Sequence, residues 1–461
     1  MICFNKKIKV LLGVVILQTA TISWAQSQQK VSMLPLEKVW AQIHGESPMQ
    51  KSAQLQVESF EASKDRASLH WLPRLYLDAK HYQTNEAGSQ FFGLLQQRSL
   101  ENTDFNANDI NHPKTTWSTR AALGVDWALY EGGMKSAQSS MYTEMSQAQK
   151  KASSQLALEQ YAQVAQFYGS IGLIQQQKQK ISDLLKVIER LTKSYQIGQR
   201  SNPVGYSGLL GLKSLSNRLM GLLSQYEAQQ NSYHASLKEM GLKEDLWAPQ
   251  FADVISYVDN KMNYVCSPGV SCEAQLSQSK SLKVKSFEQN ATASEFAAQM
   301  EKARYLPRLG AFAESSLFKS ERDTSDSYIV GLYLQWNLYN PNELGLSKEA
   351  QLKAAANTQQ VKALDQQERA ERASLLQAIQ ALKSNLTLLN ESQKLMTEQI
   401  QVTETLFKNG SVNALQFVEV LSRRADLLTS QSDAGIDLMQ KSASLLTKSA
   451  WDIAAVNANE K

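Results

Sequence analysis

The sequence predicts a mainly α-helical chain with membrane-type β-strands, built as a duplicated unit of helix, strand, strand, long helix and long helix. Three observations predict this fold. Landmark motifs occur twice in the same order, apolar residues follow heptad spacing over long proline-free segments, and period-two alternation precedes each of these segments. The chain of 461 residues is long enough to bury a core without obligatory disulfides or a structural metal.

Residues 1–25 have the pattern of a secretory signal peptide. The segment contains a charged start, a short apolar stretch and a cleavage site with small residues, namely Lys6, Lys7 and Lys9, residues 10–17, and Ser23-Trp24-Ala25. The apolar stretch is far shorter than the ~20 residues that a spanning helix needs, which disfavours an N-terminal membrane anchor. No later apolar run has that length. We therefore expect either a periplasmic protein or a β-barrel of the outer membrane.

Composition argues against several classes of function. Lys+Arg 48 against Asp+Glu 44 gives a net charge of +4, and the chain without the three signal-segment lysines carries +1. Such a chain is a poor binder of polyanions, so no nucleic-acid partner is expected. The five histidines and three cysteines are scattered, and neither HExxH nor GxSxG occurs. We expect no enzyme, no metal site and no cofactor.

Cys266 and Cys272 flank the turn-prone segment Ser-Pro-Gly-Val-Ser. In an oxidising compartment two cysteines at this spacing can close a small loop, so a structural disulfide is the favoured interpretation. A redox or metal pair would need CxxC spacing or further ligands, and neither is present. Two free thiols are the alternative.

The chain repeats itself once. Trp71-Leu72-Pro73-Arg74-Leu75 recurs as Tyr305-Leu306-Pro307-Arg308-Leu309, Trp127-Ala128-Leu129-Tyr130 as Trp336-Asn337-Leu338-Tyr339, and Tyr195-Gln196-Ile197-Gly198 as Phe407-Lys408-Asn409-Gly410. The first half carries about 25 additional residues, 88–113, between its first two landmarks, which we expect to form a longer external loop. The predicted units are a first repeat at 26–250, a linker at 251–272, a second repeat at 273–455 and a tail at 456–461.

Long helical hairpins are predicted at about 133–241 and 343–455. Apolar residues step by three, four or seven in both halves, as in Ile181, Leu184, Ile188 and Leu191 and again in Leu375, Ile379, Leu382, Leu386 and Leu389. This is the seam of helices that pack as coiled coils. No proline occurs from 135 to 197, so one helix of about 60 residues is allowed, and Gly198 and Gly410 stand where the periodicity stops.

Strands are predicted at about 74–82, 118–130, 308–318 and 327–339. Ala121, Leu123, Val125, Trp127 and Leu129 share one face of the second strand, and the other face is polar or small. A half-buried strand of a soluble sheet would look the same, but the aromatic residues at the strand ends suit a membrane interface. Four strands cannot close a barrel, so oligomerisation is expected, and a trimer would supply about twelve strands.

These features resemble the TolC-like outer-membrane efflux protein family over essentially the whole chain. The resemblance rests on the duplicated Leu-Pro-Arg-Leu at 72–75 and 306–309, on Leu129-Tyr130-Glu131-Gly132-Gly133, on the two turns at Gly198 and Gly410, and on the stretch at 92–113, which is similar to the external loop of one branch. It implies a homotrimeric duct: a 12-stranded β-barrel in the outer membrane that continues into a long periplasmic α-helical coiled-coil tunnel. Such ducts dock with a periplasmic adaptor protein and an inner-membrane pump, which supplies the energy.

The resemblance also implies functional positions. Counting from Gly410, the periplasmic gate residues would be Gln416 and Glu419, of which only Glu419 is acidic, and three copies of Glu419 near the axis would attract cations. Glu419 as an ordinary exposed helix residue is the alternative. The adaptor-contacting tips would include Gly198, Asn202, Pro203, Asn409 and Gly410.

Other functions fit less well. Type I protein secretion uses the same kind of duct, and cargo is chosen mainly by the pump, so the sequence barely separates it from small-molecule efflux. A coiled-coil adaptor should have one hairpin flanked by β-domains instead of two hairpins each preceded by membrane-type strands. Metal export would be suggested by aligned Met or His residues, which are not seen.

Overall fold

The computed structural model describes residues 32–195, 203–244, 247–262, 279–451 and 453. The predicted signal segment, Gly198, Asn202 and the pair Cys266 and Cys272 lie outside the described residues. Among the helices of the described ranges, none combines the length and apolar character needed to cross a membrane.

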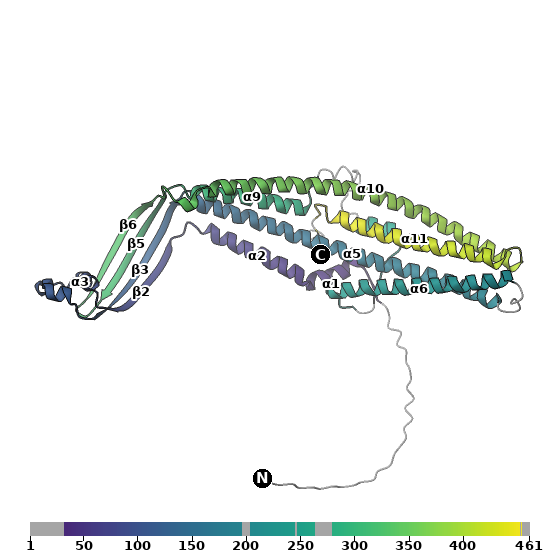
Figure 1. Ribbon diagram of the computed structural model, residues 1–461, viewed down its shortest axis with the longest axis horizontal. Helices are drawn as coiled ribbons and strands as arrows, with labels where there is room; N and C mark the ends of the chain where they lie inside the picture. The colour runs from purple at the N-terminus through teal and green to yellow at the C-terminus, as the bar shows by residue number, and fades with distance from the viewer. Residues whose placement is uncertain (1–31, 196–202, 245–246, 263–278, 452, 454–461) are drawn as a thin grey trace, which may run out of the picture.

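The molecule is elongated, with a β-sheet at one end and long helices that run to the other end (Figure 1). The first repeat contains α2 (Pro48–Ser68), β2 (Arg74–Thr84), β3 (Thr116–Glu131), α5 (Met134–Tyr195) and α6 (Pro203–Glu239). The second contains α9 (Leu282–Ala303), β5 (Arg308–Lys319), β6 (Thr324–Gln335), α10 (Leu346–Lys408) and α11 (Ala414–Leu446). The predicted order of helix, strand, strand, helix, helix is confirmed in both halves.

Shorter elements complete the described chain. The connection between β2 and β3 contains α3 (Ala87–Gln96), the 3-10 helix η1 (Asn102–Phe105) and α4 (Ala107–Asn111), so the predicted external loop is partly helical. Beside the helices lie β1 (Ser32–Leu34), α1 (Leu36–Glu46), β4 (Trp247–Pro249) and α7 (Val254–Lys261), and the 3-10 helix η2 (Pro341–Glu343) follows β6.

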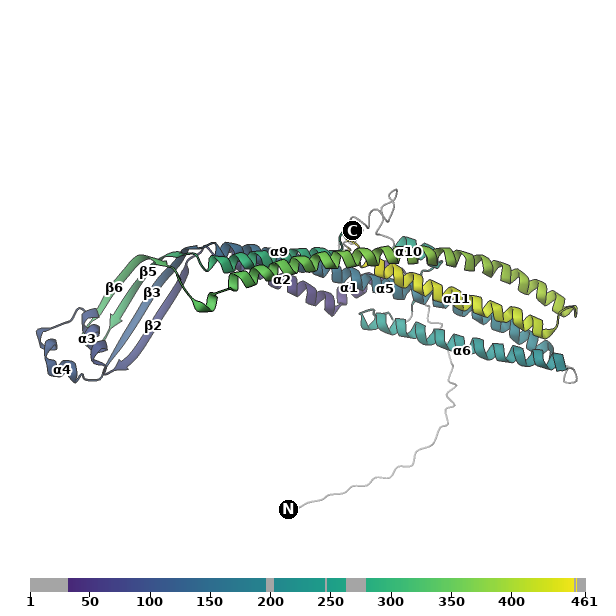
Figure 2. The ribbon, with the colours of Figure 1, turned by 45° about the horizontal axis from the view of Figure 1, so that its top comes forward.

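Two very long helices, α5 and α10, form the frame of the helical body. Along α5, α2 lies near the sheet and α6 near the far end, and α9 and α11 divide the length of α10 in the same way (Figures 1 and 2). Helices α9 and α11 also pack against α5, which joins the two repeats into one body. In each repeat, one long unbroken helix therefore runs beside two shorter helices that follow each other along its length.

The heptad seam predicted from the sequence forms the core of the far half of the body. The buried side chains come from α5, α6 and α11, and include Ile181, Leu184, Ile188, Leu191, Leu212, Leu219, Phe417 and Leu421. Leu386 and Ile379 of α10 are buried in the neighbouring cluster. Most helical stability in proteins comes from tertiary packing, and the packing of these apolar stripes supplies it here.

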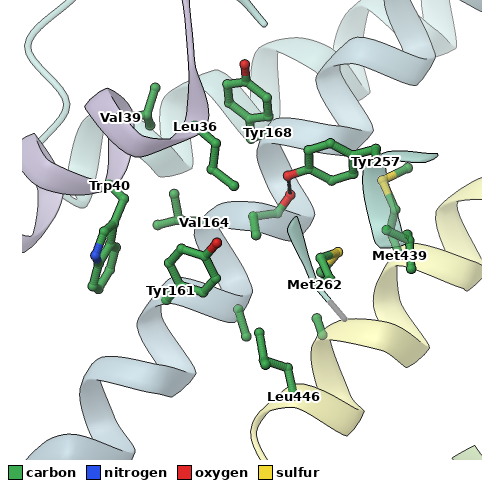
Figure 3. Packing of buried hydrophobic residues seen from close by; sticks show 14 of the residues in the cluster. Leu36, Val39, Trp40, Tyr161, Val164, Tyr168, Tyr257, Met262, Met439 and Leu446 are labelled. Carbon is green, nitrogen blue, oxygen red and sulfur yellow. Dashed lines mark hydrogen bonds between the residues drawn. The ribbon is translucent and has the colours of Figure 1, made fainter. Parts of the chain in front are cut away.

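A second core lies at mid-length, where the short elements cover α5. Figure 3 shows Leu36, Val39 and Trp40 of α1 facing Tyr161, Val164 and Tyr168 of α5, with Met439 and Leu446 of α11 nearby. The Tyr168 hydroxyl donates to Leu34 O of β1 at 2.6 Å and accepts from the Gln250 N–H at 2.7 Å. Burial raises the pKa of Tyr168 to about 12. Buried polar groups need hydrogen-bond partners. The Tyr168 hydroxyl finds them in β1 and in the residue after β4, so it fixes both segments to α5.

The four long strands form one antiparallel sheet in the order β2-β3-β5-β6. Leu77 of β2 lies opposite Leu123 of β3, which lies opposite Ser315 of β5, so the two repeats meet at the β3–β5 pair. The closed barrel stays a prediction, because this sheet is open with β2 and β6 at its edges.

Three details differ from the sequence prediction. Strand β6 ends at Gln335 instead of about 339, because β5 begins at Arg308, opposite Gln335, and offers no partner beyond it. A bulge shifts the register between Ala128 and Tyr130, so that Tyr130 lies opposite Leu309 and Leu129 has no partner residue in β5. Helix α11 ends at Leu446 rather than near 455, and the chain turns so that the Trp451 ring packs 5.4 Å from the Tyr161 ring.

Candidate functional site

One face of the sheet is apolar and exposed. Its side chains alternate with those of the other face along every strand, and the exposed members include Leu75, Leu77, Leu123, Leu317, Tyr328, Val330, Leu332 and Leu334. A continuous apolar surface of this kind marks contact with lipid or another protein. The strands have 11, 16, 12 and 12 residues, which suits tilted strands that cross a bilayer.

The opposite face is polar and held by side-chain hydrogen bonds. Glu314 of β5 accepts from the Tyr76 hydroxyl at 2.9 Å and from Arg120 Nη2 at 2.5 Å, which links three strands. Tyr333 donates to Asp126 Oδ1 at 3.2 Å and links β6 to β3. A face of this composition is suited to contact with water. The sheet therefore has one apolar face and one polar face.

Two tyrosines on the polar face cover glycines of the adjacent strand. Tyr76 lies opposite Gly124 and Tyr333 lies opposite Gly310, and a Cβ added at either glycine would overlap the tyrosine ring. A ring placed over a glycine shields strand backbone that would otherwise be uncovered. The two pairs occupy equivalent places in the two repeats, which the sequence alone did not reveal because the partners are far apart along the chain.

Aromatic residues lie at the junction between the sheet and the helices. Trp127 donates its indole N–H to Trp71 O at 2.7 Å, and Trp336 donates to Tyr305 O at 3.1 Å. The landmark residues of the duplication therefore make the same contact in each half. Their rings are largely exposed, as aromatic residues are where a membrane meets water.

The far ends of the long helices carry the predicted gate residues and those predicted tip residues that the structure describes. Gly410, with φ of +74°, follows Asn409, the C-cap of α10. Its N–H donates to Phe407 O at 3.0 Å, and the Ser411 N–H donates to Leu406 O at 2.9 Å. This is the Schellman arrangement, which satisfies the last carbonyls of a helix. Asn409 caps the same helix, and Pro203 is the first residue of α6.

The structure gives Gln416 and Glu419 different surroundings. Gln416 forms a capping box with Asn413 at the start of α11: Gln416 Oε1 accepts from the Asn413 N–H at 3.1 Å, and Asn413 Oδ1 accepts from the Gln416 N–H at 2.9 Å. Glu419 is exposed and accepts from Arg423 Nε at 3.1 Å, one turn along the same helix. Gln416 therefore has a structural task, and Glu419 projects a carboxylate into solvent.

Sequence reasoning missed two glycines that bring the hairpin ends together. A Cβ added at Gly208 of α6 would overlap Ala414 of α11, and one at Gly211 would lie 3.2 Å from Val418 Cγ1. Arg218 and Asp426 form an ion pair between the same two helices. The signal that could have found them is the spacing of three between small residues, which allows close helix contact on one face.

Two basic side chains lie where α5, α10 and α11 pack together, a few turns away from the far ends of these helices. Lys180 Nζ donates to Gln393 Oε1 at 3.2 Å, and Arg424 Nη1 donates to Gln393 O at 2.9 Å. Burial lowers the pKa of both groups, and the nearby Arg424 charge lowers that of Lys180 further. Within the described residues, no three His, Cys, Asp or Glu side chains gather as a metal site would require.

Comparison with solved structures decides the fold. CusC, whose structures address transmembrane channel formation, matches with a TM-score of 0.75 at 13% identity over 91% of this chain and 94% of that chain. The open-state MtrE outer membrane channel of Neisseria gonorrhoeae matches with a TM-score of 0.73 at 13% identity, over 90% and 88%. The CmeC outer membrane channel of Campylobacter jejuni matches with a TM-score of 0.73 at 10% identity, over 99% and 97%.

The chain has the fold of these outer-membrane channels. No family model matches the sequence, and no curated protein matches it. The predicted fold class is confirmed by this channel fold, which extends over nearly the whole chain.

Proposed function

We propose that three copies of this chain form an outer-membrane exit duct of a tripartite efflux system, which passively conducts substrates delivered by a periplasmic adaptor and an inner-membrane pump. The observation that carries the proposal is a sheet with one exposed apolar face and one polar face, continued by two long helical hairpins in the fold of outer-membrane channels. The apolar face would contact lipid and the polar face would line water.

The strand arrangement supports closure by copies of the same chain. Neighbouring strands are antiparallel throughout, and the sheet has four strands. With an even number, β6 of one copy and β2 of the next run in opposite directions, so they can pair without a parallel seam. Closure would satisfy the backbone groups of both edges, which a bilayer requires.

The helix ends are the proposed docking and gating region. The turns around Gly198, Asn202, Pro203, Asn409 and Gly410 would contact the adaptor, and Glu419 would narrow the tunnel with its carboxylate. The cleft between α6 and α11, of about 420 Å³ and bordered by polar residues such as Gln225, Gln229, Asp433 and Gln440, lies further along the same two helices and offers a surface for a partner helix.

Native mass spectrometry of the detergent-extracted protein is the first test. A trimer supports the duct, and planar-bilayer recording of that trimer should then show ion-conducting channels. A monomer that stays in solution without detergent would contradict the proposal, because four strands cannot close a barrel.

Cargo needs a separate test. A deletion strain carrying the duct with its pump and adaptor should export small molecules; restored secretion of a large protein with no change in small-molecule export would instead favour type I secretion.

A further inference from the structure

The connection between β2 and β3 lies at the end of the sheet, and α3 within it packs against one face of the sheet. Gly93 of α3 lies on the ring of Phe318, and a Cβ added at Gly93 would lie 3.6 Å from Phe318 Cζ. Phe318 belongs to the polar face, opposite Arg120, and is only 5% exposed. Helix α3 therefore covers the polar face around Phe318, at the end of the sheet remote from the long helices (Figure 2).

An ion pair fixes this connection to the turn between β5 and β6. Arg322 in the turn donates from Nη1 and Nη2 to the two carboxylate oxygens of Asp104, at 2.6 and 2.5 Å. The same Nη1 donates to Ser99 O at 3.1 Å. The Asp104 side chain is 9% exposed, so water competes little on that side. A two-point contact of this kind fixes orientation as well as distance.

A buried amide makes a second attachment between the same segments. Gln97 Oε1 accepts from the backbone N–H of Arg322 at 3.3 Å and of Asp323 at 3.0 Å. Its Nε2 donates to Gly93 O at 3.2 Å. The β2–β3 connection and the β5–β6 turn, one from each repeat, are thus a single unit.

Large apolar side chains project from this unit into solvent. Phe92 is 62% exposed, Phe105 58% and Leu95 45%. The ring of Phe91 contacts both other rings edge-on, with centroids 6.1 Å from Phe92 and 5.9 Å from Phe105. Scattered exposed apolar residues are ordinary, but a cluster of large exposed apolar side chains on a rigidly attached segment is typical of a contact surface.

We propose that Phe92, Leu95 and Phe105 of three copies meet across the outer mouth of the duct and form a second constriction, held in place by Asp104 and Arg322. The inference rests on the proposed function, because only a closed trimer makes the polar face a lumen. The occupant is another copy of this chain because the unit sits on that face, where the three copies converge. Apolar side chains that meet in a wet pore exclude water and ions.

Cross-linking tests the contact between copies. In the full chain, Phe92→Cys should give oxidised, SDS-stable dimers, whereas Met49→Cys on α2, also exposed, should give none beyond the wild-type background set by Cys266 and Cys272. A trimer with an unlinked, reactive thiol at position 92 would indicate a surface turned toward lipid or an external protein and would overturn the constriction.

Conductance tests the ion pair. Asp104→Asn and Arg322→Gln should each raise the mean conductance of the trimer severalfold, while the control Asp109→Asn, an exposed acid of α4, should leave it at the wild-type level. A conducting trimer whose conductance these variants do not change would overturn the constriction alone. A chain that forms neither trimer nor channel would overturn the proposed function, and the constriction with it.

Discussion

At the residue scale, Gly410 ends α10 in a conformation that favours glycine. Its φ of +74° lies in the left-handed region, and nothing lies within 4 Å of an added Cβ, so the penalty of a side chain there comes from the backbone alone. Gly410→Ala should lower the free energy of unfolding by roughly 1–2 kcal/mol. Gly45→Ala in α1, which also meets open space, should be neutral or stabilising. Thermal melts followed by circular dichroism would show the difference, and equal melting shifts would contradict it.

A steric contact, rather than the backbone, makes Gly208 necessary. An alanine there would overlap Ala414, whereas Gly221 of the same helix has nothing within 4 Å. Gly208→Ala should destabilise by about 1–3 kcal/mol through overpacking, and Gly221→Ala should stabilise by up to about 1 kcal/mol because alanine is the better helix former. Denaturant titration of the two variants in one detergent measures both. A loss of stability for Gly221→Ala would contradict the prediction that helix propensity decides whether an alanine in α6 stabilises or destabilises the protein.

At the element scale, the sequence contained enough information for the order and type of the long elements. Heptad steps such as Ile181 to Leu184 to Ile188 identify helices, and alternation such as Val330 and Leu332 identifies strands, because both are local periodic signals. Ends were harder: alternation continues through Trp336 to Tyr339, but β6 stops where its partner strand stops. A strand end depends on register, which no local pattern encodes.

The contacts of the site could not be predicted for the same reason. Glu314 binds Tyr76 across 238 positions and Asp104 binds Arg322 across 218. Neither pair has a spacing that marks it in the sequence. Gly410 was predicted as a helix end because its signal is local. The capping box of Asn413 and Gln416 is equally local, with a spacing of three residues, but it was not predicted.

The two faces of β6 give an element-scale prediction. Val330 and Ile329 are adjacent, 71% and 55% exposed, and point to opposite faces. Val330→Arg should place a charge in lipid at a cost of about 2–4 kcal/mol near the bilayer midplane, while Ile329→Arg should be tolerated on the wet face. The amount of folded trimer in the outer-membrane fraction is the measurement. A reversed order of the two variants would mean that the faces are assigned the wrong way round.

The ion pair of the outer mouth should respond to acid. Hydrogen bonds from Arg322 and from the Glu101 N–H lower the pKa of Asp104. The pair therefore contributes stability above the ordinary carboxyl value of about 4 and loses it as the pH falls through the lowered pKa. The other charged or titratable groups around it are Glu101, Asp109, His112, Lys114 and Glu321.

Conductance should thus stay constant from about pH 8 to pH 5 and rise only below about pH 4. Asp104→Asn should be open at neutral pH and should lack this acid response. An increase centred well above about pH 4 would contradict the assignment to Asp104.

At the scale of the whole molecule, the duplication explains how a single chain supplies the sheet at one end and the helical hairpins at the other. Each repeat supplies two strands and a hairpin, and the repeats join through β3 and β5 at one end and through α5, α6 and α11 at the other. A sheet of even strand number can then close with further copies, and the helical bodies can associate around the same axis. The outer unit at Phe92 and the inner ends at Glu419 would therefore control opposite mouths of one pathway.

The inner mouth gives the last prediction. If three Glu419 carboxylates surround the axis, they favour cations, so Glu419→Ala should shift the reversal potential in a salt gradient toward that of an unselective pore. Arg423→Ala should shift it the other way, because it removes the cation bound to Glu419. Glu398→Ala, an exposed acid of α10, is the control and should have no effect. If Glu419→Ala and the control behave alike, Glu419 is an ordinary surface residue and the gate must be sought elsewhere on α11.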